Sequence, residues 1–467
     1  MANNGMNPVG RPIGTTNNAT FGTDGVRGHA GTVLTPSLVL ELGYCTSQVL
    51  QSEGPILIGQ DSRKSGDMLA AALTAGLTAA GKEVWKIGLC PTPTIPYLIK
   101  TLGAAGGLMV SASHNPPEDN GIKIFDSNGI KIDSGTQLLI EKTLTDELSK
   151  KKSTPSFSDF GKAYQRNDLL KSYQTGILSS VKEKSLEGVS IVLDLCWGSA
   201  TACGAELFKS LGADLTVLHG KPDGSRINVN CGSTKLDRLR ATVIKKGAGM
   251  GFAFDGDADR VLAVDEKGRI IDGDHVLYLW GSTLQDRGEL PENRLVATVM
   301  SNLGFERDWA KRGGILERTP VGDQHVHSTM VSTGATLGGE QSGHILSAKH
   351  GLCGDGIMTA LQVATICNGK KLTLSEWRDE SFHAFPQKLV NISLTKAAQQ
   401  KNWKDCEPII NAVSKAEAAM GEDGRVLLRA SGTEPLFRVM VEAKSQEEVD
   451  SWTTHLAHVV EQNFKAT

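Results

Sequence analysis

Short apolar runs recur along the chain with the spacing of strand–helix–strand units. In three places an apolar strand is followed by a helical stretch, a glycine and a second apolar strand. The predicted units are strands 55–59 and 83–88 around helix 66–80, strands 190–195 and 214–218 around helix 199–211, and strands 295–300 and 315–319 around helix 303–312. Strands connected in this way pair in parallel, and the glycines suit helix C-caps. The repetition favours three separate α/β domains over one α/β sheet that repeats the unit internally.

The pattern changes from about residue 385 onward. Strands are predicted at 391–395, 425–431 and 437–444, followed by a polar helix at 445–463, which together indicate a small α+β domain. The Lys/Ser/Pro-rich segment 151–159 is a plausible linker, and the polar segment 1–19 is a predicted flexible extension. The predicted organisation is therefore an extension (1–19), α/β domains at 20–160, 161–268 and 269–384, and an α+β domain at 385–467.

The composition and the net charge argue against several classes of protein. The 467 residues include 49 Lys+Arg and 52 Asp+Glu, so the formal net charge is −3, without the basic excess of nucleic-acid-binding proteins. No apolar run approaches the length of about 18 residues that suggests a membrane span, and the first residues contain no secretory h-region. Eight scattered cysteines without a CxxC pair favour buried thiols in a reducing compartment. We therefore expect a cytoplasmic globular protein that binds neither nucleic acid nor membranes.

Three carboxylates follow an apolar run at alternate positions in FDGDADR (254–260). Asp255, Asp257 and Asp259 would repel one another unless a cation neutralised them, and all-oxygen ligation suits Mg²⁺ or Ca²⁺. An EF-hand is one alternative, but its sixth loop position would be Arg260 instead of glycine. A solvated acidic turn is the other. The pattern favours a divalent-metal site.

A serine and a histidine follow another apolar strand, which is predicted to end at Val110. Ser113 and His114 therefore lie at the carboxyl end of a strand, where α/β proteins bind ligands. A serine beside a histidine suggests a hydrolase pair, but adjacent residues on a loop rarely face each other. A plain turn around Asn115-Pro116-Pro117 is the structural alternative, although it does not account for the Ser-His-Asn cluster.

Two further loops carry groups that suit a phosphorylated sugar. In TLGGEQSGHIL (336–346), Glu340, Ser342 and His344 alternate, and Glu and Ser would bind sugar hydroxyls; taken alone, a generic turn is the better interpretation. In LLRASGTEPLFRVMVE (427–442), guanidinium, hydroxyl and backbone groups suit a phosphate dianion, with an ordinary hairpin as the alternative. The candidate residues there are Arg429, Ser431, Gly432, Thr433 and Arg438.

Taken together, the four loops resemble the α-D-phosphohexomutase family. The similarity runs from FGTDGVRG (21–28) to RASGTEPLFRVMVEA (429–443), with SASHNPPEDNGIK, DGDADR and GGEQSGH between them in family order. FGTDGVRG, GGEQSGH and NCGST (230–234) are most similar to the members that act on glucosamine phosphates. The resemblance implies three similar α/β domains with mixed sheets and a smaller C-terminal α+β domain around a central cleft, with one loop from each domain.

The resemblance also implies a reaction. Ser113 would be carried as phosphoserine and would bind Mg²⁺ together with the three aspartates. Its phosphate would pass to glucosamine 6-phosphate, giving a hexosamine 1,6-bisphosphate, and the other phosphate would return to Ser113. The product, glucosamine 1-phosphate, would feed UDP-N-acetylglucosamine synthesis. The alternatives are phosphomannomutase/phosphoglucomutase activity on other sugars, or a sugar-phosphate phosphatase.

The same resemblance assigns roles to individual residues. Glu340 and Ser342 would hold the sugar hydroxyls, and the loop that begins at Arg429 would hold the phosphate that is not reacting. Lys123 is a candidate general acid/base. The candidate catalytic residues are Ser113, Lys123, Arg27, His114, Arg260 and His344. The expected partner is a small phosphosugar, and the expected state is a monomer or a homodimer.

Overall fold

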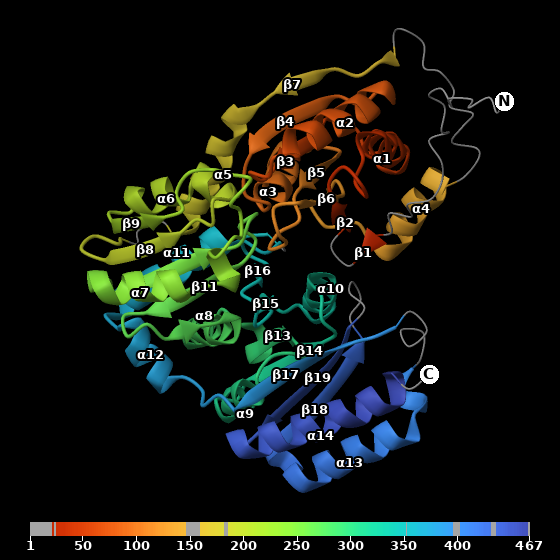
Figure 1. Ribbon diagram of the computed structural model, residues 1–467. Coiled ribbons are helices and arrows are strands. Elements are labelled where there is room, and N and C mark those ends of the chain that lie inside the picture. Colours follow the sequence, from red (N-terminus) through yellow and green to blue (C-terminus); the bar gives the residue numbers. More distant parts are fainter. Residues whose placement is uncertain are drawn as a thin grey trace, which may run out of the picture.

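The computed structural model describes residues 21–22, 25–145, 159–181, 185–351, 353–395, 402–430 and 436–465 (Figure 1). The predicted extension at 1–19 and nearly all of the predicted linker at 151–159 lie outside these residues. Within them the chain forms four sheets. The sheets follow one another in an arc in the order of the sequence, with the first and the fourth at its two ends (Figure 1).

The first sheet is mixed, with strand order β1-β2-β6-β5-β3-β4-β7. Strands β3, β4, β5 and β7 run parallel, and β1, β2 and β6 pair antiparallel. β7 lies after the domain boundary predicted at residue 160 and still pairs with β4, so this sheet extends beyond that boundary. The elements are β1 (Phe21–Gly22), β2 (Gly25–His29), α1 (Pro36–Val49), β3 (Ile56–Gln60), α2 (Gly66–Ala79), β4 (Val84–Leu89), α3 (Thr94–Leu102), β5 (Gly106–Val110), β6 (Asp119–Phe125), α4 (Ser134–Thr145) and β7 (Ala163–Gln165).

The second sheet has the order β12-β11-β10-β8-β9, with a parallel part and an antiparallel part. Its strands are β8 (Ser190–Asp194), β9 (Asp214–Leu218), β10 (Met250–Phe254), β11 (Val261–Asp265) and β12 (Ile270–Ile271). The helices of this region are α5 (Leu170–Ser180), α6 (Gly204–Ser210) and α7 (Asp237–Lys246). The helix predicted at 199–211 is divided, because a short 3₁₀ turn at Ser199–Ala202 precedes α6.

The third sheet has the order β14-β13-β15-β16. Its strands are β13 (Arg294–Thr298), β14 (Ile315–Thr319), β15 (Leu337–Gly339) and β16 (Ile345–Ser347). The helices are α8 (Gly273–Asp286), α9 (Leu303–Lys311), α10 (Asp323–Thr333), α11 (Gly356–Lys370) and α12 (Leu374–Glu380). Helix α11 contacts β10 and β11 of the second sheet, and one apolar core includes Leu193 and Phe252 of that sheet together with Ile357 and Leu361 of α11. The second and third sheets therefore share a core.

The first three sheets repeat one arrangement. In each, two parallel strands are joined by a helix that ends next to a glycine with positive φ, at Gly81, Gly212 and Gly313. A further parallel strand then turns back into an antiparallel partner: β5 into β6, β10 into β11, and β15 into β16. Each of these turns carries one of the loops singled out from the sequence. The predicted fold class, three similar α/β domains with mixed sheets, is confirmed.

The fourth sheet is smaller and antiparallel, with the order β17-β19-β18. Its strands are β17 (Gln387–Ser393), β18 (Gly424–Ala430) and β19 (Leu436–Ala443), and helices α13 (Glu407–Met420) and α14 (Gln446–Lys465) lie side by side against it (Figure 1). The α+β domain was predicted, but helix α13 was missed. Its buried residues Ile409, Ala412, Ala416 and Met420 recur at helical spacing, so the signal was present in the sequence.

All eight cysteines are free thiols; six are buried, as expected, whereas Cys353 and Cys406 are half-buried. No helix within the described ranges is long and apolar enough to cross a membrane.

Candidate active site

Ser113 lies at the turn between β5 and β6, with a left-handed backbone (φ +51°). Its hydroxyl is buried and donates a hydrogen bond to Asp255 Oδ2 at 2.5 Å. His114 Nδ1 lies 3.2 Å from the same Ser113 oxygen. The expectation that these adjacent side chains would not face each other is therefore wrong, since the two atoms lie within hydrogen-bonding distance.

His114 is a neutral imidazole near pH 7. Burial, followed by the positive charges of Arg260 and Arg27, lowers the pKa of His114 from 6.5 to about 4. Arg27, on β2, also donates from Nη1 to Asn115 Oδ1 at 3.3 Å. The structure thus brings Arg27 and Arg260 close to the Ser113 turn, where a phosphate would carry negative charge.

The three aspartates of the β10–β11 turn form a compact buried cluster. One carboxylate oxygen from each of Asp255, Asp257 and Asp259 lies within 4.8 Å of the others. Burial and the two neighbouring carboxylates raise the pKa of Asp255 well above its ordinary value. Asp257 Oδ1 is buried with no hydrogen-bond partner among the described residues. Clustered carboxylate oxygens with an unsatisfied buried oxygen fit a hard divalent cation such as Mg²⁺.

Lys123 and Thr92 of the first domain reach into this cluster. Lys123 of β6 is buried, and its Nζ lies 2.7 Å from Asp257 Oδ2 and 2.6 Å from Asp259 Oδ2. Thr92 donates from Oγ1 to Asp257 Oδ2 at 2.5 Å. Arg260 donates its backbone N–H to Asp255 Oδ1 at 3.1 Å. The serine turn and the aspartate turn therefore form one polar site across two domains.

The third turn, between β15 and β16, contributes Glu340, Ser342 and His344. Glu340 is buried and accepts a hydrogen bond from Gly322 N at 3.3 Å, and exposed Ser342 lies 3.5 Å from Glu340 Oε2. His344 is buried, and its Nε2 has no hydrogen-bond partner among the described residues. A Cβ at Gly354 would lie 1.6 Å from the His344 ring, so only glycine leaves room for the imidazole there.

The fourth loop is described only at its two ends. Arg429 of β18 and Arg438 of β19 lie directly opposite each other on neighbouring strands. Burial and the charge of Arg438 lower the pKa of Arg429, while the negative charge of Glu340 acts in the opposite direction. The third and fourth loops therefore influence each other electrostatically. The candidates Ser431, Gly432 and Thr433 lie outside the described residues.

Comparison with known proteins agrees with this architecture. Four models of phosphoglucomutase/phosphomannomutase domains match the chain in order: α/β/α domain I at residues 18–151, α/β/α domain II at 171–268, α/β/α domain III at 272–385 and the C-terminal domain at 389–459. The chain belongs to the phosphoglucomutase/phosphomannomutase family. The resemblance inferred from the four loops is thereby confirmed.

Individual members of the family match over nearly their whole length. A phosphoglucosamine mutase of Prochlorococcus marinus (strain MIT 9313) is 64% identical over 459 residues, which cover 98% of each chain. The structure of a phosphoglucomutase/phosphomannomutase family protein from Burkholderia thailandensis aligns with a TM-score of 0.79 at 24% identity, covering 95% of this chain and 97% of that one. Aspergillus fumigatus N-acetylphosphoglucosamine mutase, in complex with GlcNAc-6P and magnesium, aligns with a TM-score of 0.68 at 18% identity, covering 95% and 96%. At these identities the two structures show a shared fold.

Several polar residues around the Ser113 turn of this phosphohexomutase were not predicted. Thr92 contacts the aspartate cluster, whereas Arg63 and Asn228 contact the backbone of the turn itself. Arg63 follows β3 at the same end of the sheet as Ser113, so its position after a strand was an available signal. Asn228 lies two residues before the NCGST segment, and nothing in the sequence around it predicts a contact with the Ser113 turn.

Proposed function

We propose that the protein interconverts glucosamine 6-phosphate and glucosamine 1-phosphate through a phosphorylated Ser113 and a hexosamine 1,6-bisphosphate. The observation that carries this proposal is the buried contact between the Ser113 hydroxyl and a carboxylate of the three-aspartate cluster. The high identity to proteins named phosphoglucosamine mutase supports the choice of an amino sugar.

In the forward direction, the bond between Ser113 Oγ and phosphorus breaks, and the sugar 1-hydroxyl oxygen takes the phosphoryl group. The hydroxyl proton leaves to a nearby base, and the released Ser113 oxygen takes up a proton. The bisphosphate then turns, and the phosphate at the 6 position passes to Ser113 Oγ, which gives up its proton, while the former sugar oxygen takes up a proton. Two groups are candidates for moving these protons: neutral His114, whose Nδ1 is 3.2 Å from Ser113 Oγ, and Lys123, which lies between two aspartates of the cluster that Ser113 contacts.

Mg²⁺ would be held by Asp255, Asp257, Asp259 and the phosphorylated Ser113, and it would supply positive charge that polarises the phosphoryl group. Lys123 balances part of the carboxylate charge, while Arg27 and Arg260 place cations near the same turn. Phosphoryl transfer depends mainly on such positioning and charge stabilisation. Asp255 itself orients the Ser113 hydroxyl when the serine is not phosphorylated.

The other two loops would hold the sugar. Glu340 and Ser342 would bind hydroxyls that are present in both orientations. At the same turn, His344 Nε2 has no hydrogen-bond partner among the described residues. Arg429 and Arg438 would hold the phosphate that is not reacting, together with Ser431, Gly432 and Thr433. Because the substrate turns between the two transfers, one centre for phosphoryl transfer and one site for the non-reacting phosphate are sufficient.

The test is an incubation of the purified protein with glucosamine 6-phosphate, Mg²⁺ and a trace of hexose bisphosphate, followed by ³¹P NMR. We expect a signal from glucosamine 1-phosphate and, by peptide mapping, phosphate on Ser113. Release of free phosphate would instead support a sugar-phosphate phosphatase, and an unchanged spectrum would support a binding protein. Ser113→Ala should remove turnover with an unchanged circular dichroism spectrum, since a loop hydroxyl contributes little to packing.

A substrate panel separates the amino-sugar mutase from a phosphomannomutase/phosphoglucomutase. We expect kcat/KM for glucosamine phosphate to exceed that for glucose phosphate by about ten- to a hundred-fold, the value of one hydrogen bond to a charged group. Equal or higher kcat/KM with glucose or mannose phosphate would refute the amino-sugar assignment while leaving the mutase chemistry in place. The proposal includes a cytoplasmic location, with which eight free cysteines are compatible, and a monomeric or homodimeric state.

A further inference from the structure

Arg63 is buried beneath the Ser113 turn, and all five N–H groups of its guanidinium are engaged. Nε donates to Asp61 Oδ2 at 3.0 Å. Nη2 donates to the backbone oxygens of Ser113 at 2.9 Å and Asn115 at 2.8 Å. Nη1 donates to the backbone oxygens of Pro116 and, at 2.8 Å, Asp119. One side chain from the end of β3 thus binds four carbonyl groups of the turn.

Asn228 binds two of the same carbonyl groups from the second domain. Its Nδ2 donates to the backbone oxygen of Ser113 at 2.8 Å and to that of Asn115 at 2.9 Å. Each carbonyl oxygen has two lone pairs, so Arg63 and Asn228 together satisfy both oxygens. We call Arg63 and Asn228 the carbonyl clamp.

The space around the clamp is closely filled. A Cβ built at Gly256, within the aspartate turn, would lie 2.5 Å from Ser113 O and 3.0 Å from Asn228 Nδ2. Any other residue at position 256 would therefore displace the clamped carbonyl or the amide. The backbones of the serine turn and the aspartate turn meet at this point, beside the Ser113–Asp255 contact.

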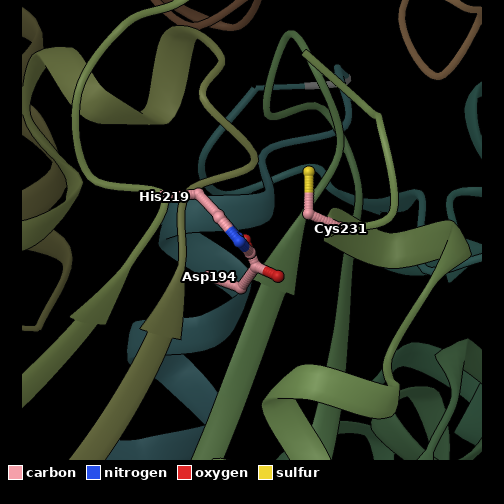
Figure 2. Close-up of side chains that lie close together, drawn as sticks. All are labelled: Asp194, His219 and Cys231. Carbon is pink, nitrogen blue, oxygen red and sulfur yellow. The ribbon is translucent and has the colours of Figure 1, made fainter. Parts of the chain in front are cut away.

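A buried polar cluster is linked to Asn228 through Cys196. Figure 2 shows its members Asp194, His219 and Cys231. His219 points toward the Asp194 carboxylate and donates from Nδ1 to Oδ1 at 2.7 Å. Asp194 also accepts backbone N–H groups from Cys196 at 3.0 Å and Gly232 at 3.1 Å, which ties the turn after β8 to the segment that contains Asn228. The Cys196 thiol in turn donates to Asn228 Oδ1 at 3.1 Å, which leaves the Asn228 amide nitrogen directed at the carbonyls. Asp194 thus connects His219, Cys196 and Gly232, and we assign this cluster a supporting role for Asn228.

We propose that Arg63 and Asn228 are positioning residues that hold Ser113 in register with the aspartate cluster across the boundary between two domains. Arg63 belongs to the domain of Ser113, and Asn228 to the domain of Asp255. Ser113 has a left-handed backbone, a conformation that costs free energy and persists only where the surroundings impose it. The clamp imposes this conformation and fixes the serine oxygen relative to the carboxylates. The expected loss of turnover rests on the proposed mutase function. The expected loosening of the Ser113 turn does not, and it can be measured without turnover.

Asn228→Asp is the sharpest perturbation, because it keeps the size of the side chain and replaces the donating amide by a second acceptor. Asn230→Asp is its matched control: Asn230 lies two residues further along, is exposed, and has the same left-handed backbone (φ +62° at Asn228, φ +52° at Asn230). Both variants add the same charge to the same segment. Asn228→Gly removes the side chain while keeping a residue that adopts positive φ without strain.

We expect Asn228→Asp and Asn228→Gly to lower kcat about ten- to a hundred-fold, because a displacement near 1 Å in the reacting groups costs about that much. KM for the sugar phosphate should stay within about threefold, since Glu340, Arg429 and Arg438 belong to other loops. Asn230→Asp should keep the wild-type kcat. Arg63→Lys should also lower kcat, because an ammonium has three donors in place of five.

Hydrogen exchange gives a readout that does not require turnover. The backbone N–H groups of Ser113 and Asn115 donate to Ser111 Oγ and Ala112 O within the turn. In Asn228→Asp, exchange should accelerate at least about tenfold in the peptide spanning 111–118 and remain unchanged in α11 and β19. Equal exchange and equal kcat in the Asn228 and Asn230 variants would overturn the clamp, as would a loss of protection throughout the protein. An inactive wild-type protein would refute the mutase proposal, and the exchange comparison would still test the clamp.

Discussion

Asp355, at the start of helix α11, permits a quantitative prediction of how the free energy of unfolding depends on pH. The side chain is buried, accepts the backbone N–H of Met358 at 2.9 Å and accepts the Tyr173 hydroxyl at 3.0 Å. Burial raises the pKa of Asp355 from 3.8 to about 6, against the lowering effect of these hydrogen bonds. At pH 5 the folded protein therefore holds a proton on Asp355 that the unfolded chain has released.

This proton has a defined effect on stability. Because the folded state binds more protons between pH 4 and 6, the free energy of unfolding decreases as the pH rises through this range. Each tenfold change in proton concentration contributes about 1.4 kcal/mol, so a rise of the pKa from 3.8 to about 6 corresponds to a loss of about 3 kcal/mol at pH 8. An asparagine side chain at this position would remain neutral, cap the helix through Oδ1 and donate from Nδ2 to the Tyr173 oxygen. Asp355→Asn should therefore gain stability relative to wild type by about 3 kcal/mol between pH 4 and pH 8.

The assay is hydrogen exchange of the α11 peptide in both proteins at matched pH, so that intrinsic exchange rates cancel. We expect the protection ratio of variant to wild type to rise about a hundredfold from pH 4 to pH 8. Asp272→Asn is the control, because Asp272 also caps a helix, α8. Although burial favours its neutral form, the charge and hydrogen bonds of His275 lower the pKa of Asp272, so its removal should bring no gain as the pH rises. A ratio for Asp355→Asn that stayed constant or decreased with pH would refute the argument.

Three further predictions concern the site itself. Asp257→Asn should weaken Mg²⁺ binding at least about tenfold in calorimetric titration, because one of three anionic ligands is lost; unchanged affinity would place the metal elsewhere. Lys123→Met should lower the free energy of unfolding by about 3–5 kcal/mol in urea titrations without Mg²⁺, because buried Asp257 and Asp259 lose their cation. Added Mg²⁺ should recover part of this loss, and a variant as stable as wild type without metal would contradict the role given to Lys123. Arg429→Gln should raise KM for the sugar phosphate about tenfold or more while changing kcat less, and steady-state kinetics showing an unaltered KM would remove Arg429 from the phosphate site.

Hydrophobic periodicity and the residues at strand ends allowed part of the fold and part of the candidate site to be predicted from the sequence. The strands at 190–195, 214–218 and 315–319 were predicted within one residue of β8, β9 and β14, because each begins within two residues of a glycine that ends the preceding segment. The aspartates of 255–259 could be grouped because neighbours at alternate positions must lie close together. Their contact with Ser113 came from the family resemblance, since the two segments are separated by more than a hundred residues.

The clamp could not be predicted in the same way. Arg63 and Asn228 bind backbone carbonyl groups, which every residue carries, so their acceptors leave no mark on the sequence of the turn. Helix α13 was missed although its amphipathic spacing was present: the only helix predicted in the α+β domain was the one at 445–463. The strand β7 was not predicted, and its pairing with β4 could not be, because the two strands are far apart in the sequence.

The two ends of the proposed site carry opposite charges. At one end, three carboxylates lie within 4.8 Å of one another, and burial and their mutual repulsion raise the pKa of Asp255. At the other end, Arg429 and Arg438 lie directly opposite on neighbouring strands, an arrangement of like charges that destabilises a sheet. A divalent cation would relieve the first repulsion and a phosphate dianion the second. A ligand that carries phosphate, bound together with a metal ion, is therefore the partner to which both ends are complementary, and neither ligand alone would satisfy the whole site.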